Sequence, residues 1–100
     1  MEIGELVVDL QKRSVAMAGQ PVHLTPHQFD LLRVHALNAG KLLTQRQLLQ
    51  EVWGPGYADA ANLLQVNVSQ LRRKLEPDRA HPRYLLTEPG AGYRLVDPAA

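Results

Sequence analysis

The sequence contains no cysteine, which excludes disulfide bonds and thiolate metal sites. This absence suits a reducing compartment, and we expect a cytoplasmic protein. No run of apolar residues approaches the length of a membrane span, and the N-terminus lacks the charged and then apolar pattern of a signal peptide. We therefore expect no membrane partner.

Excess charge is also scarce, because the formal net charge is only +1. Proteins that bind nucleic acid through a broad basic surface carry a larger excess, so any affinity for DNA must come from local clustering. The only run of three basic residues is Arg72, Arg73 and Lys74. Such a run is equally typical of a solvated helix end, where cations interact favourably with the helix dipole.

The residue combinations that enzymes need are missing too. The histidines are scattered along the chain, and no acidic partner completes the spacing of a metal site or of a catalytic triad. The sequence has no HExxH motif, no phosphate-binding glycine loop and no nucleophile elbow. We expect no catalysis, no metal and no cofactor.

The chain does have the size and composition of one folded domain, which we expect to span residues 1–100. It has 100 residues, of which 45% are hydrophobic and 21% charged, and both values are ordinary for globular proteins. Short apolar or alternating runs at residues 6–8, 15–17 and 22–24 are separated by turn residues. They predict two or three antiparallel strands near the N-terminus.

Two capping boxes predict the first two helices. Thr25 precedes Pro26 at the first helical position, with Gln28 three residues after the threonine. Thr44 and Gln47 repeat this spacing. The first helix should end near residues 38–40, which read Asn-Ala-Gly, and the second near residues 54–56, which read Gly-Pro-Gly.

A third helix over residues 60–75 should begin at an Asp59 cap and end before Pro77. Residues 84–87 and 93–96 then predict a hairpin around a glycine-containing turn. Strands, three helices and a terminal hairpin predict an α+β fold, a winged helix-turn-helix. The same scaffold also serves proteins that dock other proteins, so the fold alone leaves both functions open.

The third helix has two distinct faces. Leu64, Val68, Leu71 and Leu75 fall within one narrow arc at 100° per residue, which predicts a buried face. The opposite side carries small amides, a hydroxyl, a guanidinium and one valine, which are groups that read base edges. Its members are Asn62, Val66, Ser69 and Arg73, with Gln65 and Arg72 on one flank and Gln70 on the other.

Each of these side chains has alternative roles. Arg73 is placed to reach guanine or phosphate, and Val66 to contact a thymine methyl unless it is only partly exposed. Asn62 could bind adenine or belong only to the first turn. Arg72 is interpreted as a phosphate clamp, with a structural ion pair as the alternative. Trp53 is expected to serve in packing.

Four segments together resemble the C-terminal effector domain of OmpR/PhoB-type response regulators. They read, in order, LTPHQFDLLR, LLTQRQLLQEVWG, LRRKLEPD and PRYLLTEPGAGYRL, and the resemblance covers roughly residues 6–96. It implies an N-terminal four-stranded sheet, a third helix in the DNA major groove and a hairpin wing at the adjacent minor groove. Within the family, QLLQEVWGPGY and RYLLTEPGAGYR are similar to the KdpE branch, which controls a potassium-uptake operon.

The resemblance also implies partners. Double-stranded DNA would be bound by two copies, head to tail on direct repeats, and an upstream receiver domain absent from this chain would be phosphorylated by a sensor histidine kinase. Residues 54–58 match a segment that contacts RNA polymerase in some members. The implied DNA-facing residues of the helix and the wing are Asn62, Leu63, Val66, Asn67, Ser69, Gln70, Arg72, Arg73, Thr87, Tyr93 and Arg94.

Further phosphate contacts are expected from Arg46 and from the free amides of the second helix near Thr44. The chain departs from the family at several positions. Many members have basic residues where this chain has Asn62, Ser69 and Gln70, which implies fewer phosphate contacts here. The wing tip reads Glu88-Pro89 where many members carry a basic residue.

Overall fold

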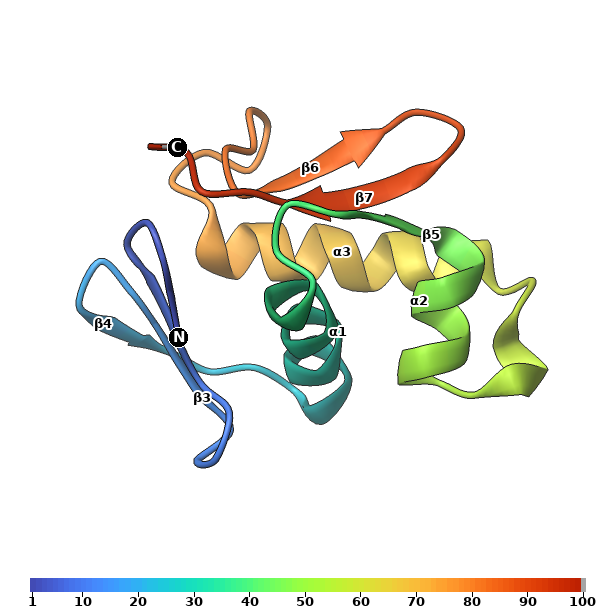
Figure 1. Ribbon diagram of the computed structural model, residues 1–100, viewed down its shortest axis with the longest axis horizontal. Coiled ribbons are helices and arrows are strands. Elements are labelled where there is room, and N and C mark those ends of the chain that lie inside the picture. Colours follow the sequence, from blue (N-terminus) through green and yellow to red (C-terminus); the bar gives the residue numbers. More distant parts are fainter. Residues whose placement is uncertain (100) are drawn as a thin grey trace.

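The computed structural model describes residues 1–99, in which two antiparallel sheets flank three helices (Figure 1). The expected α+β winged helix-turn-helix is confirmed. The elements in chain order are β1 (Glu2–Ile3), β2 (Leu6–Asp9), β3 (Ser14–Met17), β4 (Gln20–Val22), α1 (Pro26–Leu37), β5 (Leu42–Thr44), α2 (Gln45–Val52), the 3₁₀ helix η1 (Pro55–Tyr57), α3 (Ala61–Leu75), β6 (Leu85–Glu88) and β7 (Gly92–Leu95).

The N-terminal sheet has four strands in the order β1-β2-β3-β4, as the family resemblance implies. Alternation along the sequence predicted only two or three. The missed strand is β1, which has only two residues, and the run expected at residues 22–24 is replaced by β4, which lies two residues earlier and has Pro21 in its middle. A period of two cannot be detected over so few residues. Leu24 lies outside the sheet, which ends at Val22.

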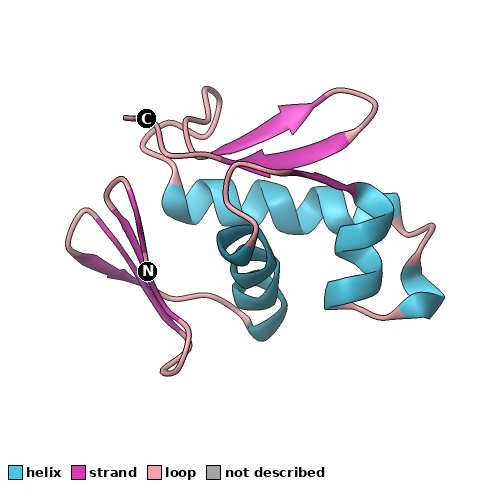
Figure 2. Cartoon of the chain, viewed as in Figure 1, coloured by secondary structure: helices cyan, strands magenta, loops and turns pink. Residues whose placement is uncertain are grey.

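The second sheet contains a strand that the sequence did not reveal. β5 pairs with β7, so the sheet order is β5-β7-β6 and the hairpin is joined to the segment between α1 and α2. Three residues give no periodic pattern, and β5 runs directly into the α2 cap. The hairpin itself lies within one residue of the predicted bounds, and Figure 2 shows it running beside α3.

Both predicted capping boxes are present. The Thr25 hydroxyl accepts from the Gln28 amide at 3.2 Å while the Gln28 side-chain oxygen accepts from the Thr25 amide at 3.1 Å. Thr44 and Gln47 make the equivalent pair at 3.1 and 2.8 Å. α2 ends at Val52, slightly before the glycines. No described helix is both long and apolar enough to cross a bilayer.

The Asp59 cap of the third helix is wrong. α3 begins at Ala61 with Ala60 in the cap position, and no side chain caps it. The Ala60 amide donates to the Tyr57 carbonyl, which makes a turn that starts the helix one residue too late for Asp59. The Asp59 carboxylate instead lies 3.5 Å from the Arg46 guanidinium.

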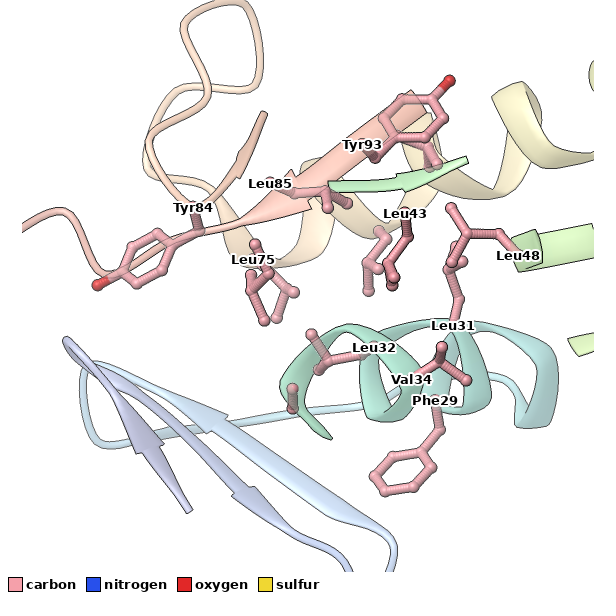
Figure 3. Packing of buried hydrophobic residues seen from close by; sticks show 14 of the residues in the cluster. Phe29, Leu31, Leu32, Val34, Leu43, Leu48, Leu75, Tyr84, Leu85 and Tyr93 are labelled. Carbon is pink, nitrogen blue, oxygen red and sulfur yellow. The ribbon is translucent and has the colours of Figure 1, made fainter. Parts of the chain in front are cut away.

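The core lies among the three helices, one face of the second sheet and buried residues of the N-terminal sheet such as Leu6 and Val8, and Figure 3 shows part of it. The predicted buried face of α3 is confirmed, since each of its four members is at most 3% exposed. α1 contributes Leu31 and Leu32, α2 contributes Leu48, and the wing contributes Leu85. Helix and wing therefore share one core, which fixes the orientation of the outer face of α3.

Gly92 marks the closest approach of β7 to β5. A Cβ atom there would overlap the Leu43 carbonyl oxygen and lie 2.9 Å from the Thr44 Cα. We expect Gly92→Ala to lower the free energy of unfolding by about 3 kcal/mol, because backbone atoms cannot yield as a flexible side chain can. Chemical denaturation measures this change.

Gly56→Ala is the matched control, because a Cβ at Gly56 meets nothing within 4 Å. It should change stability by less than about 0.5 kcal/mol. Equal stabilities for the two variants would contradict the close approach of β5 and β7.

His35 is buried on α1 with 0% of its surface exposed. Neither ring nitrogen has a hydrogen-bond partner within residues 1–99. Burial lowers the pKa of His35 from 6.5 to about 4, because charging the imidazole in the core has no compensating partner. The ring therefore remains neutral at physiological pH.

Between pH 6.5 and pH 4 the unfolded chain binds a proton at His35 that the folded chain excludes. The contribution of neutral His35 to stability is therefore complete above pH 6.5 and lost as the pH falls toward 4. Relative to His35→Leu, the wild type should lose about 3 kcal/mol over this range. Urea unfolding at several pH values measures the difference, and parallel pH profiles would contradict it.

Candidate nucleic-acid interface

The outer face of α3 is exposed as its periodicity predicts. Asn62, Val66 and Arg73 all lie on the exposed side, opposite the four buried residues. Val66 is 46% exposed and is the only large hydrophobic residue that α3 exposes. The Val66 side chain is therefore accessible from the outer side of α3. Gln65 and Ser69 are also exposed, and Leu63 is half-buried.

The flank of α3 next to α1 is held by side-chain hydrogen bonds. The Gln28 amide group donates to the Gln70 side-chain oxygen at 2.9 Å, and Lys74 donates to the Gln28 oxygen at 2.7 Å. Asn67 donates to the Leu63 carbonyl at 2.9 Å. Gln70 and Asn67, both expected to face DNA, thus already have protein partners. The sequence predicted Gln28 only as part of a capping box, and nothing in it indicated that Gln28 also binds α3.

Arg72 on the other flank joins α3 to the wing. Its guanidinium donates to the Leu85 carbonyl at 3.0 and 2.8 Å and to the Thr87 hydroxyl at 2.7 Å, and it lies 5.7 Å from the centre of the Tyr93 ring. Burial lowers the pKa of Arg72, but an arginine remains charged. The ion-pair alternative is wrong, because no carboxylate in the described part of the chain lies within 4 Å of it.

Glu76 makes the second junction between α3 and the wing. It is only 7% exposed, and its carboxylate accepts from the backbone amides of Arg83, Tyr84 and Leu85 at 2.8 to 3.1 Å. Sequence reasoning missed this residue. An acidic side chain at a helix C-terminus opposes the helix dipole, and that mismatch was the available sign of a special role.

The remaining residues predicted to contact DNA lie on the wing, and they differ in how far they are exposed. Thr87 is exposed, whereas the Tyr93 side chain is only 5% exposed and packs beside Arg72. Arg94 pairs with Glu88 at 3.1 Å and donates to the Gly40 carbonyl at 2.7 Å. The arginine thus offsets the acidic residue at the wing tip, and the hairpin presents little net positive charge.

The start of α2 offers a second exposed segment. The Thr44 hydroxyl accepts a hydrogen bond from the Gln47 amide. The other amides of the first helical turn lack intrahelical partners and can donate to an anion. Arg46 beside them is exposed, and its 3.5 Å contact with exposed Asp59 is weak.

The segment after α2 is more ordered than the expected loop. η1 occupies Pro55–Tyr57, and the Tyr57 side chain is 47% exposed. Trp53 packs partly against the core, with its ring 5.0 Å from that of His27. Within the described residues, no group of three metal-ligating side chains comes together.

Comparison with known proteins agrees with this geometry. Residues 19–95 match the family model described as transcriptional regulatory protein, C terminal. The chain is 49% identical over 95 residues to the transcriptional regulatory protein KdpE of Mycobacterium tuberculosis, and 46% identical over 96 residues to the KDP operon transcriptional regulatory protein KdpE of Escherichia coli. These alignments cover 95% and 96% of the chain but only 42% and 43% of those proteins.

A solved structure supports the same fold. The DNA-binding domain of RstA from Klebsiella pneumoniae, crystallised in complex with the RstA box, superposes with a TM-score of 0.88 at 29% identity. The superposition covers 97% of this chain and 96% of that domain. The likeness therefore extends over the N-terminal sheet, the three helices and the wing.

The Glu76 carboxylate yields a stability prediction. Glu76→Gln keeps the shape but replaces one acceptor with a donor that faces backbone amides. The free energy of unfolding should fall by about 2 to 3 kcal/mol, because buried amides lose a charged acceptor. Amide exchange at Tyr84 and Leu85 should accelerate together with this loss.

Glu88→Gln is the control, since it removes a part-buried surface pair at the other end of the hairpin. It should cost less than about 1 kcal/mol. Unchanged amide protection at the start of β6 in Glu76→Gln would contradict the role of this carboxylate.

Proposed function

Because the chain belongs to the family of transcriptional regulatory protein C-terminal domains, in the OmpR/PhoB effector class, we propose that it binds double-stranded DNA sequence-specifically. α3 enters the major groove, and the domain is the DNA-binding output of a two-component response regulator. The observation that carries this proposal is the exposed polar face of α3, held in a fixed orientation by its buried opposite face and by the wing.

The roles of the side chains follow from their chemistry. Arg73 lies at the centre of the outer face and can donate two hydrogen bonds to guanine. Asn62 can pair with adenine near the helix start, and Val66 can contact a thymine methyl. These three exposed residues carry base recognition, whereas Gln70, Asn67 and Arg72 shape the flanks through their protein contacts.

The competing function is a winged helix that docks protein. A docking helix should present an aromatic or aliphatic patch, since the core of a protein interface is apolar. The outer face of α3 offers only Val66 as a large exposed hydrophobic residue. DNA binding is therefore favoured.

Affinity for DNA should be modest and strongly dependent on salt. Roughly 4 to 6 phosphate contacts per copy, from Arg72, Thr87, Arg94, Arg46 and the α2 amides, predict loss of most binding between low and physiological salt. Two copies on direct repeats would supply the missing affinity. The Arg94 guanidinium contributes less than an unpaired wing arginine, because it neutralises Glu88.

The longer relatives suggest the wider context. An upstream receiver phosphorylated by a sensor histidine kinase would control pairing on DNA, and Gly54–Ala58 would contact RNA polymerase. Similarity to the KdpE proteins supports a potassium-uptake operon among the regulated genes. A regulator that binds chromosomal DNA in this way would be located in the cytoplasm.

Selection of bound duplexes from a random DNA pool tests base recognition. The wild type should enrich a short motif, repeated about one helical turn apart. Arg73→Ala should blur that motif at one base position and weaken binding by about 1 to 3 kcal/mol, because a bidentate contact is lost. Sequencing the recovered pools gives both profiles.

Arg73→Lys is the matched control, since it retains the charge but not the planar pair of donors. It should blur the same position with a smaller loss of affinity. An unchanged profile for Arg73→Ala would remove Arg73 from base recognition. No enriched motif from a folded wild type would favour protein docking instead.

A further inference from the structure

A cleft is lined by residues of α3, of β7 in the wing and of the loop that leads from α3 to β6. Figure 1 shows this loop at the C-terminal end of α3. The volume of the cleft is about 450 Å³. The lining residues are Gln65, Val68, Ser69, Arg72, Arg79, Ala80 and Tyr93. Arg79 belongs neither to the outer face of α3 nor to the wing, because it lies on the loop between them, and it has no role in the function proposed above.

The lining of the cleft is suited to an anion. It contains two arginines and no carboxylate, together with a hydroxyl and a carboxamide that can donate hydrogen bonds. The Arg72 guanidinium is fixed by neutral acceptors on the wing, so its charge is held in place without being cancelled by an ion pair. The carboxylate of Glu76, at the end of α3, is directed to the amides of residues 83–85.

The loop is shaped by its own hydrogen bonds. Asp78 accepts from the Ala80 amide at 3.0 Å and lies 3.0 Å from the His81 ring, while the His81 amide donates to the Asp78 carbonyl at 3.0 Å. The Asp78 carboxylate is thus turned toward the loop itself, and the partners around it lower its pKa. Arg79 between these residues lines the cleft.

We propose that this cleft binds a backbone phosphate of the DNA duplex and that Arg79 is its principal contact, with Ser69 and Gln65 as further donors. The proposal rests on the proposed function, because the phosphate belongs to the DNA strand that passes between the wing and the major groove that α3 enters. Arg72 supports the site through its fixed charge. Phosphate contacts fix the register of a protein on DNA without reading sequence.

Binding of Arg79→Ala to two fluorescent duplexes tests this role, one carrying the selected motif and one of unrelated sequence. The variant should bind both roughly fivefold more weakly than the wild type, and the slope of log affinity against log salt should shrink by about 0.9. Arg83→Ala is the matched control. It lies on the same loop but lines a different cavity, and its affinity should match the wild type.

A second measurement locates the phosphate. A series of motif duplexes is made in which each duplex has one phosphate replaced by an uncharged methylphosphonate. At one position the replacement should lower the affinity of the wild type but not lower the affinity of Arg79→Ala any further. Additive losses at every position would overturn the contact, because Arg79 would then act only through its distant field. Arg79→Lys should recover part of the affinity.

The outcomes separate the two proposals. A wild type that binds no duplex would overturn both the DNA-binding function and this site. A wild type that binds DNA with Arg79→Ala unchanged would overturn only the site. Inorganic phosphate that displaces neither duplex yet shifts the amide resonances of Ser69 and Arg79 would indicate a small-anion site and would also overturn the proposal.

Discussion

The buried carboxylate of Glu76 is the constraint on which the outer surface depends. It stands at the end of α3 and accepts from three successive backbone amides at the start of the wing. A buried charge is tolerated only when hydrogen bonds replace its lost water, and these amides provide them. The arrangement ties the last turn of α3 to β6. The direction of the wing relative to the helix is set there.

Arg72 extends this junction one helical turn toward the outer surface. Its hydrogen bonds to Leu85 and Thr87 add a second attachment between the same two elements, so helix and hairpin should move as one body. A rigid pair suits DNA, whose grooves and phosphates have fixed spacing. The chain thereby uses one of its few clustered cations for structure.

This use of charge, in a protein of net charge +1, limits the cations that are free for DNA. Arg94 offsets Glu88, and Lys74 is bound to Gln28, so few cations remain for phosphate. A single domain with so few free cations would bind weakly, which agrees with the proposed use of two copies.

The sequence by itself determined the elements whose causes are local. Capping boxes at Thr25 and Thr44 and the spacing of the α3 leucines depend on residues within four positions, so they could be predicted, as could the exposure of Val66 and Arg73. Only the tertiary structure decided how the flanks of α3 are used. Gln28 meets Gln70 and Lys74 across 42 and 46 positions, Arg72 meets Leu85 across 13, and β5 pairs with β7. Such partners are chosen by chain packing, because a polar side chain with several possible acceptors shows no periodic preference for one of them.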